Sequence, residues 1–172
     1  MSGAEPVPSP IPTGAVVVGV DGSEAADRAV TWAARYAALE DRPLVMAHAH
    51  GTMGAPEAAG LQFDGGATFA LVYEQLRAHG EAIVAAATAK VAESDPSLGV
   101  TSVVEHADPR QLMLRLAEQA SLVVMGSRGR GPFRSLLLGS VTAGVAGRAR
   151  CPVVVIPPDE DADEEPSSES PS

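Results

Sequence analysis

The sequence predicts an α/β fold in which an open sheet of five parallel strands carries four helices on its two faces. Short, continuously apolar runs rich in valine recur along the chain, as expected of strands buried in a parallel sheet. Segments with helical periodicity lie between these runs, and such alternation is typical of βαβ units with right-handed crossovers. The chain has 172 residues, which is enough to bury one sizeable core.

The first strand is predicted at "AVVVGV", residues 15–20. A helix should follow, with Ser23 as its N-cap and the acidic Glu24 and Asp27 close to its positive end. One face of this helix carries four apolar residues: Ala26, Val30, Ala33 and Ala37. The run "PLVMAHA", residues 43–49, predicts the second strand.

Residues 50–66 are glycine-rich and aperiodic, which favours a long loop. A second helix is predicted over residues 68–93, followed by a third strand over residues 99–107. Four residues of that helix are expected to face inward: Val72, Leu76, Ile83 and Val91.

Asp108 followed by Pro109 is a favourable N-cap with a proline at the first helical position. The face of this third helix is expected to carry Leu112, Leu116 and Ala120. "SLVVMG", residues 121–126, predicts the fourth strand, a fourth helix should open near Ser140, and "CPVVVIP", residues 151–157, predicts the fifth strand.

The charge is concentrated at one end of the chain. Of a net charge of −10, seven acidic residues lie in the tail "PPDEDADEEPSSESPS", so the rest of the chain carries only −3. A nearly neutral body does not favour a nucleic-acid binder, which would normally show a basic face. We expect a disordered N-terminal tail (1–14), one domain (15–157) and a disordered acidic tail (158–172).

Three further observations favour a cytoplasmic protein that does not bind membranes. The sequence has no apolar run long enough for a transmembrane helix, and its N-terminus lacks the pattern of a signal peptide. Cys151 is the single cysteine, so an intramolecular disulfide is impossible, and we expect a structural thiol. His48 and His50 alternate on a strand end, but no carboxylate or cysteine lies nearby in the sequence, so a metal pair is not expected.

A loop rich in glycine and arginine follows the fourth strand, in "VVMGSRGRGPFRSLLLGSVTAG". Gly126 and Gly129 come directly after the strand, and Gly139 and Ser140 stand where the next helix begins. Glycines let a backbone approach a phosphate closely, and a helix start offers free N–H groups, so the pattern indicates a polyphosphate site. Neither a Walker lysine motif nor a dinucleotide G-x-G-x-x-G follows the first strand.

The spacing Gly126-x2-Gly129-x9-Gly139-Ser140 resembles the ATP-binding motif of the universal stress protein family. "VVVGVDGSEAADRAVTWAARYA" at the first strand and helix, and "CPVVVIP" at the end, are similar to that family as well. The resemblance covers roughly residues 15–157. It implies a Rossmann-like fold, a dimer and binding of ATP.

The resemblance carries site residues over by position. It implies that Asp21 lies near ribose and phosphates, that Leu44 contacts adenine, and that Met125 lies just before the motif on the opposite side. The implied ribose and phosphate contacts are Gly126, Gly129, Gly139, Ser140 and Val141.

The charged residues near the predicted phosphate site leave several alternatives open. We expect Arg128 to contact phosphate, whereas Arg130 and Arg134 are expected to be solvated loop charges. Asp21 would hold Mg²⁺ or its solvent shell, or only hydrogen-bond the sugar. The predicted cofactors are therefore ATP and, with it, Mg²⁺.

The predicted function is that of an ATP-binding regulator of the stress response rather than a fast enzyme. The alternatives are a slow ATPase or phosphotransferase, or a sensor of another adenine nucleotide such as cyclic AMP. Phosphate cleavage needs a positioned base or water, and the spacing suggests no candidate for it. The resemblance implies that the short apolar last strand lies at the sheet edge and pairs antiparallel with its copy in a second subunit. An unpaired apolar edge invites association, so we predict a homodimer through Val153, Val154 and Val155. The sequence predicts no particular regulatory partner protein.

Overall fold

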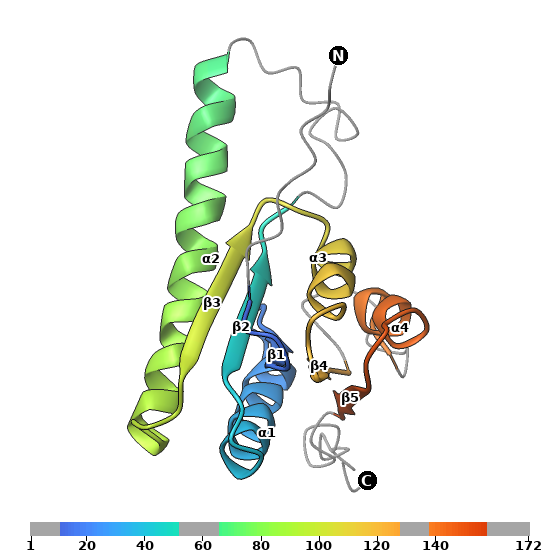
Figure 1. Cartoon of the computed structure of the whole chain (residues 1–172). Helices are drawn as coiled ribbons and strands as arrows, with labels where there is room; N and C mark the ends of the chain where they lie inside the picture. The colour runs from blue at the N-terminus through green and yellow to red at the C-terminus, as the bar shows by residue number, and fades with distance from the viewer. Residues whose placement is uncertain (1–10, 52–65, 128–137, 158–172) are drawn as a thin grey trace, which may run out of the picture.

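The computed structural model describes residues 11–51, 66–127 and 138–157 (Figure 1). Within these ranges, five parallel strands form one sheet in the order β3-β2-β1-β4-β5. The strands are Val16–Gly19 (β1), Leu44–Ala49 (β2), Val100–Glu105 (β3), Leu122–Gly126 (β4) and Val153–Ile156 (β5). The helices are Glu24–Leu39 (α1), Gly66–Ser94 (α2), Pro109–Leu116 (α3) and Ser140–Ala146 (α4). The predicted fold class is confirmed.

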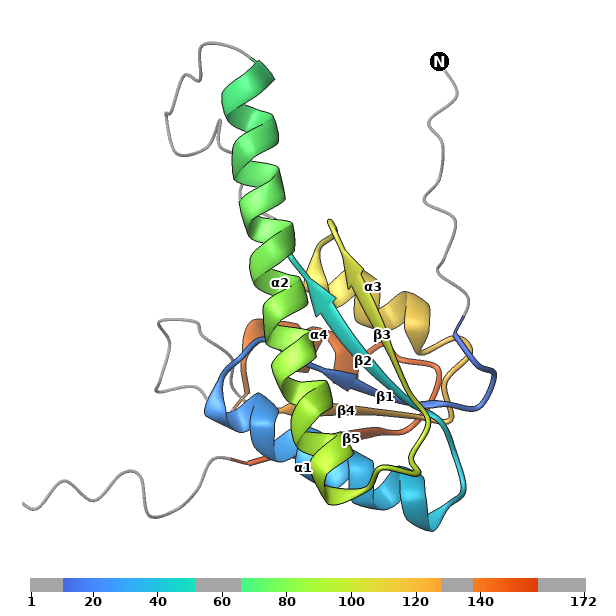
Figure 2. The same ribbon diagram turned by 90° about the vertical axis from the view of Figure 1, so that its left-hand side faces the viewer.

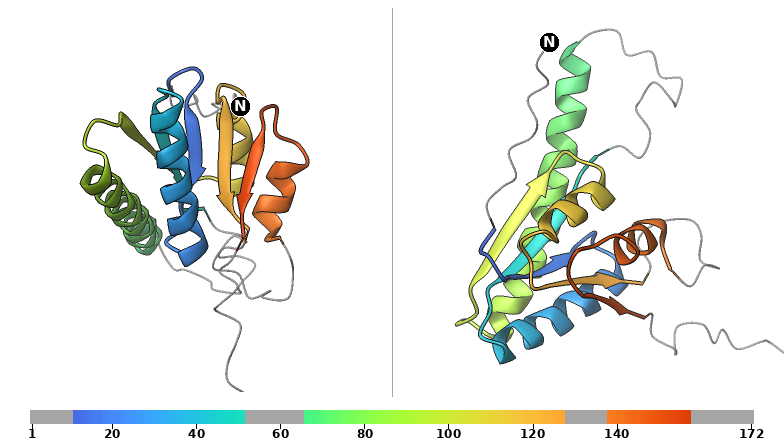
Figure 3. Two further views of the ribbon diagram at one scale, coloured as in Figure 1. Left: turned by 90° about the horizontal axis from the view of Figure 1, so that it is seen from below. Right: turned by 45° about the vertical axis from the view of Figure 1, so that its right-hand side comes forward.

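The helices cover the sheet in pairs. Figures 2 and 3 show α1 and α2 on one face and α3 and α4 on the other. Alternate residues of each strand therefore face two separate cores. In β1, Val16 and Val18 belong to the core under α1 and α2, and Val17 belongs to the core under α3 and α4. This double burial explains why the strands read as continuous valine runs rather than as an alternating pattern.

The second core also contains Ile11, which is 6% exposed. The ordered fold therefore begins before residue 15, which is the boundary that the sequence suggested. Residues 1–10 and the acidic tail from residue 158 lie outside the described ranges.

Helix α1 agrees with the prediction in its start and in its face. Ser23 is the N-cap, and its hydroxyl accepts a hydrogen bond from the N–H of Ala26 across 3.2 Å. The four residues of the predicted face are all buried: Ala26, Val30, Ala33 and Ala37. Because most of these side chains are methyl groups, the helix lies close to the sheet.

Helix α2 corrects one prediction. Its second half is packed on the sheet through Val84, Ala87 and Val91. Val72 and Leu76, however, are 40% and 37% exposed rather than inward-facing. The reason is geometric, because the first half of α2 extends past the ends of the strands and has no sheet beneath it (Figures 1 and 2).

Helix α3 begins as expected and ends early. The carboxylate of Asp108 accepts a hydrogen bond from the N–H of Gln111 across 3.0 Å, and Pro109 is the first helical residue. Leu112 and Leu116 are buried, but the helix ends at Leu116. Ala120 therefore lies beyond the helix, where it packs against the same core.

The strand order reverses between β1 and β4. The chain builds outward from β1 through β2 to β3, and then crosses to β4 and β5 on the other side. The connections that follow β1 and β4 therefore lead away from each other along the sheet. In folds of this kind, such a divergence opens a crevice at the carboxyl edge of the sheet, and ligands bind there.

Candidate functional site

The loop after β1 carries Asp21 to the carboxyl edge and holds it in a turn. One carboxylate oxygen of Asp21 accepts hydrogen bonds from the backbone N–H of Ser23, at 2.9 Å, and from its hydroxyl, at 2.6 Å. Gly22 between them has a φ of 75°, a left-handed conformation that suits glycine. Ser23 therefore caps α1 and orients Asp21 at the same time.

Two hydrogen bonds fasten the start of α4 to the end of β4. The N–H of Gly139, the N-cap, donates to the carbonyl oxygen of Ser127 across 2.7 Å. The hydroxyl of Thr142 donates to the carbonyl oxygen of Gly126 across 2.9 Å. The N–H groups of Ser140 and Val141 come next, and they have no acceptor within the helix. Gly126, Gly139, Ser140 and Val141 are thus brought together at the carboxyl edge of the sheet.

The start of α1 meets the end of β4 at Gly126. A Cβ atom on Gly126 would lie 2.9 Å from the carbonyl carbon and 2.9 Å from the Cβ of Ala25, in the first turn of α1. No ordinary side chain fits at that distance. The missing side chain thus permits the close approach of α1 to β4, which places the Asp21 turn beside the glycine motif.

The side chain of Met125 lies beneath this edge. Met125 is 7% exposed and belongs to the core under α3 and α4. Its terminal methyl would lie 3.8 Å from a Cβ atom placed on Gly19, at the end of β1. Met125 therefore forms part of the apolar floor where β1 and β4 end.

The structure does not bring Leu44 to this edge. Leu44 is the first residue of β2, pairs with Val16 at the start of β1, and is 0% exposed. Because the strands are parallel, both residues lie at the amino edge, opposite the loops described above. The residues of β2 that end at the carboxyl edge are His48 and Ala49. Strand direction, applied to the predicted second strand, is the signal that could have identified them.

Several predicted residues lie outside the described ranges. These are Arg128 and Gly129 of the site, together with Arg130 and Arg134 of the same loop. The phosphate contacts expected of Arg128 and Gly129 stay predictions.

A cluster of aromatic and imidazole side chains lies at the carboxyl ends of β2 and β3. The rings of His50, His106 and Tyr73 of α2 lie with their centroids 5.1 to 5.5 Å apart. Burial lowers the pKa of His50 below its ordinary value, and the neighbouring His106, His48 and Arg77 add to this effect. Sequence reasoning considered His48 and His50 only as metal ligands and missed this packing.

The carboxylates fit a magnesium ion only in part. Among the described residues, no group of three or more His, Cys, Asp or Glu side chains is placed to hold a metal. Mg²⁺ is commonly held by one or two carboxylates together with substrate phosphates. Asp21 fits that shared arrangement, and a site made of protein ligands alone does not form in the described part of the chain.

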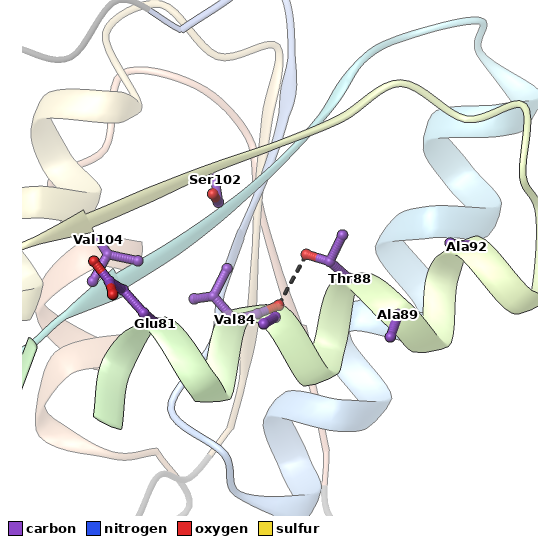
Figure 4. Close-up of a pocket in the computed structure, with 8 residues that line it drawn as sticks. Glu81, Val84, Thr88, Ala89, Ala92, Ser102 and Val104 are labelled. Atoms are coloured by element: carbon purple, nitrogen blue, oxygen red, sulfur yellow. Dashed lines mark hydrogen bonds between the residues drawn. The ribbon is translucent and has the colours of Figure 1, made fainter. Parts of the chain in front are cut away.

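A groove of about 460 Å³ lies elsewhere, between α2 and the edge strand β3 (Figure 4). Glu81, Val84 and Thr88 line it from α2, and Ser102 and Val104 line it from β3. The hydroxyl of Thr88 donates back to the carbonyl oxygen of Val84 across 2.9 Å. None of the described residues predicted for the site lines this groove.

The single cysteine lies near the start of β5. Cys151 is half-buried, and burial raises the pKa of its thiol, as expected of a structural thiol. Among the described helices, none is long and apolar enough to cross a membrane.

Comparison with known proteins identifies the relatives of this chain. Residues 13–157 match the model of the universal stress protein family. Universal stress protein Rv2005c of Mycobacterium tuberculosis (strain H37Rv) is 36% identical over 148 residues, which cover 84% of this chain and 48% of that protein. Universal stress protein Rv2623 of the same strain is 35% identical over 140 residues, covering 81% of this chain and 44% of that protein. The chain thus spans about half the length of these curated relatives.

Solved structures show the same fold. A universal stress protein crystallised in complex with cAMP is 28% identical, with a TM-score of 0.57, over 84% of this chain and 96% of that one. UspA from Lactobacillus plantarum is 20% identical, with a TM-score of 0.64, over 86% of this chain and 99% of that one. The second likeness concerns the fold alone. Together with the family match, which covers most of the sequence, these findings show that the chain belongs to the universal stress protein family.

Proposed function

We propose that this chain binds an adenine nucleotide at the carboxyl edge of its sheet, between the Asp21 turn and the start of α4. One observation carries the proposal: α1 touches β4 where Gly126 lacks a side chain, which sets the two predicted contact regions side by side. The relative crystallised in complex with cAMP supports an adenine nucleotide as the ligand.

The described residues suggest a division of roles. The N–H groups of Ser140 and Val141 point to phosphate binding, because a helix start favours anions. Asp21, whose carboxylate is oriented by Ser23, would accept hydrogen bonds from ribose hydroxyls or share a magnesium ion with the phosphates. At the β2 side of the edge, Ala49 takes the place that the resemblance gave to Leu44, because Ala49 ends that strand.

We propose ATP as the nucleotide because of the motif that runs from Gly126 to Ser140. Mg²⁺ would accompany it, held by the phosphates and Asp21. Arg128 and Gly129 would contribute phosphate contacts, as the spacing of the motif suggests.

We further propose a regulatory role in the stress response, in the cytoplasm, with nucleotide occupancy as the signal. Hydrolysis needs a positioned base or water, and in the roles proposed here Asp21 serves the ribose or the magnesium ion instead. Phosphate release should then be slower than about 0.1 s⁻¹, against a median near 10 s⁻¹ for enzymes. A faster rate that disappears in Gly139→Glu would indicate an ATPase instead.

A second copy of the chain is the proposed partner. The strand β5 occupies one edge of the sheet, and its four residues are all partly exposed. Antiparallel pairing of two β5 strands across a two-fold axis would satisfy the open hydrogen-bonding groups and bury Val153, Val154 and Val155.

Titration calorimetry with ATP tests the nucleotide site. Gly139→Glu places a carboxylate where the phosphates would lie, and binding should be lost while the protein stays folded. Gly129→Glu should act in the same way. Gly99→Glu is the matched control, because Gly99 lies before β3 at the amino edge and has no atom within 4 Å of its Cβ position. Unchanged affinity in both site variants would contradict the site assignment.

Competition experiments identify the ligand. Cyclic AMP, AMP and ATP are titrated against the same protein, and the nucleotide retained by freshly purified protein is identified by mass spectrometry. ATP should bind most tightly. A clear preference for cyclic AMP would favour the sensor alternative and would leave the location of the site unchanged.

A further inference from the structure

We infer that His48 is a positioning residue of the carboxyl edge, and that α2 keeps it in place through the space left by Gly80. The effect of His48 on ligand binding rests on the proposed nucleotide site. Its effect on the loop after β1 rests on the contacts of His48 alone.

His48 holds the residue that precedes Asp21. Its Nδ1 atom lies 2.7 Å from the carbonyl oxygen of Val20. A carbonyl oxygen only accepts, so Nδ1 carries the hydrogen. The N–H of Val20 donates to the carbonyl oxygen of Ala47 across 2.9 Å. Strand β2 therefore binds both backbone groups of Val20, through its main chain and through the imidazole of His48.

Helix α2 closes the space on the other side of the ring. A Cβ atom on Gly80 would lie 2.5 Å from Cδ2 and 2.9 Å from Nε2 of His48. Gly80 is buried, so the helix backbone itself contacts the imidazole edge. Glycine within a helix costs about 1 kcal/mol relative to alanine. In a helix otherwise rich in alanine, this glycine is explained by the room that His48 requires.

The imidazole thus lies between α2 and the end of β1. One edge of the ring bonds to Val20 and the opposite edge contacts Gly80, so the ring cannot turn without moving one of them. Val84, Ala87 and Val91 hold this part of α2 on the sheet. A displacement of α2 toward the sheet would be passed through His48 to Val20, and from there to the turn that orients Asp21.

A double-mutant cycle tests this arrangement. Gly80→Ala adds a methyl group that must push the ring, and we expect the Kd for ATP to rise roughly tenfold, within the range seen for coupled neighbours. In a His48→Ala background the methyl group has room, and the same change should alter Kd less than about twofold. Gly99→Ala is the control for adding a methyl group in open space. An equal effect of Gly80→Ala in both backgrounds would overturn the inference.

Two substitutions of His48 distinguish the effect of the hydrogen bond that it donates from the effect of the space that it fills. The amide nitrogen of asparagine can occupy the place of Nδ1, so His48→Asn should keep the affinity close to that of the unchanged protein. His48→Leu fills the space but donates nothing, and it should weaken binding about as much as Gly80→Ala. Equal affinities of the asparagine and leucine variants would contradict a role for the donor.

Amide hydrogen exchange, measured without nucleotide, tests the role of His48 separately from the proposed nucleotide binding. In His48→Leu the amides of residues 20–23 should exchange faster, while those in the middle of α1 stay unchanged. If the unchanged protein binds no adenine nucleotide but the exchange result holds, the proposed function fails and the role of His48 stands. Unchanged exchange in residues 20–23 would overturn the role of His48 whatever the nucleotide result.

Discussion

The hydroxyl of Thr142, in the first turn of α4, donates to the carbonyl oxygen of Gly126, the last residue of β4, across 2.9 Å. Thr142 is 4% exposed, so this bond is sealed from water. It joins the two ends of the glycine motif directly, across the segment between them. The side chain of Thr142 thus fixes the distance between the end of β4 and the start of α4.

Thr142→Val should destabilise the protein by about 1–3 kcal/mol, because it leaves a buried acceptor without its donor. Nucleotide affinity should fall as well, since α4 loses a fixed distance from β4. Thr142→Ser is the control, because it keeps the hydroxyl. Chemical denaturation and calorimetry on the three proteins measure both effects. A valine variant as stable as the threonine protein would show that the bond contributes nothing.

Gly126→Ala should lower the free energy of unfolding by about 1–3 kcal/mol, the usual cost of overpacking. The added methyl group would lie 2.9 Å from backbone and side-chain atoms of Ala25, which cannot rotate away. Gly99→Ala should change stability little, because no atom lies within 4 Å of its Cβ position. Thermal unfolding compares the two variants. A loss of nucleotide binding in Gly126→Ala without loss of stability would mean that this glycine serves the ligand rather than the packing of α1.

The stability of the protein should fall as the pH drops below about 6.5, and His50 should contribute to this fall. Burial holds the pKa of His50 below its ordinary value in the folded state, so the unfolded chain takes up the proton first. The contribution of His50 is fully present above the ordinary pKa and is lost as the pH falls toward the lowered value.

His50→Gln removes this titration, so the difference in unfolding free energy between neutral and mildly acidic buffer should shrink. His79→Gln, a substitution of an exposed histidine on α2, serves as the control. Denaturant titrations at several pH values give the comparison. An unchanged pH dependence in His50→Gln would mean that other groups govern it.

Val155→Lys should shift the proposed dimer toward monomer. Pairing of two β5 strands across a two-fold axis would bring the two new charges close together, and the repulsion would oppose the interface. Thr101→Lys places the same charge on β3, the opposite edge strand, and should leave the assembly intact. Light scattering measures the molecular mass of each protein. A monomeric unchanged protein would refute the dimer and would leave the nucleotide site untouched.

Most of the fold could be predicted because its signals are local. Valine runs mark strands buried on both faces, and Ser23 and Asp108 mark helix starts through hydrogen bonds to residues three positions further along. The exposed start of α2 could not be predicted, because helical periodicity does not reveal where the sheet beneath a helix ends. Val72 and Leu76 satisfy the apolar pattern and still face solvent.

The placement of the residues proposed for the site was predictable in part, for a related reason. The motif identified Gly126 and Gly139 because spacing along the chain reflects a strand, a loop and a helix in succession. The contribution of β2 depends on which end of that strand lies beside Asp21, and choosing Leu44 ignored the direction of the strand. The bond from His48 to Val20 and the contact of His48 with Gly80 join distant parts of the chain, and no local pattern encodes them.

The reversal of strand order next to β1 has a consequence for synthesis on the ribosome. The strands β1, β2 and β3 pair with one another and can associate early, whereas the other side of β1 pairs with β4, for which Val16 must find Leu122. The chain emerges from its N-terminal end, and pairings between residues distant in the sequence form slowly. The proposed nucleotide site lies at this junction. A nascent chain whose β4 and α4 are still inside the exit tunnel therefore lacks one side of the proposed site, so nucleotide binding would require the domain to be nearly complete.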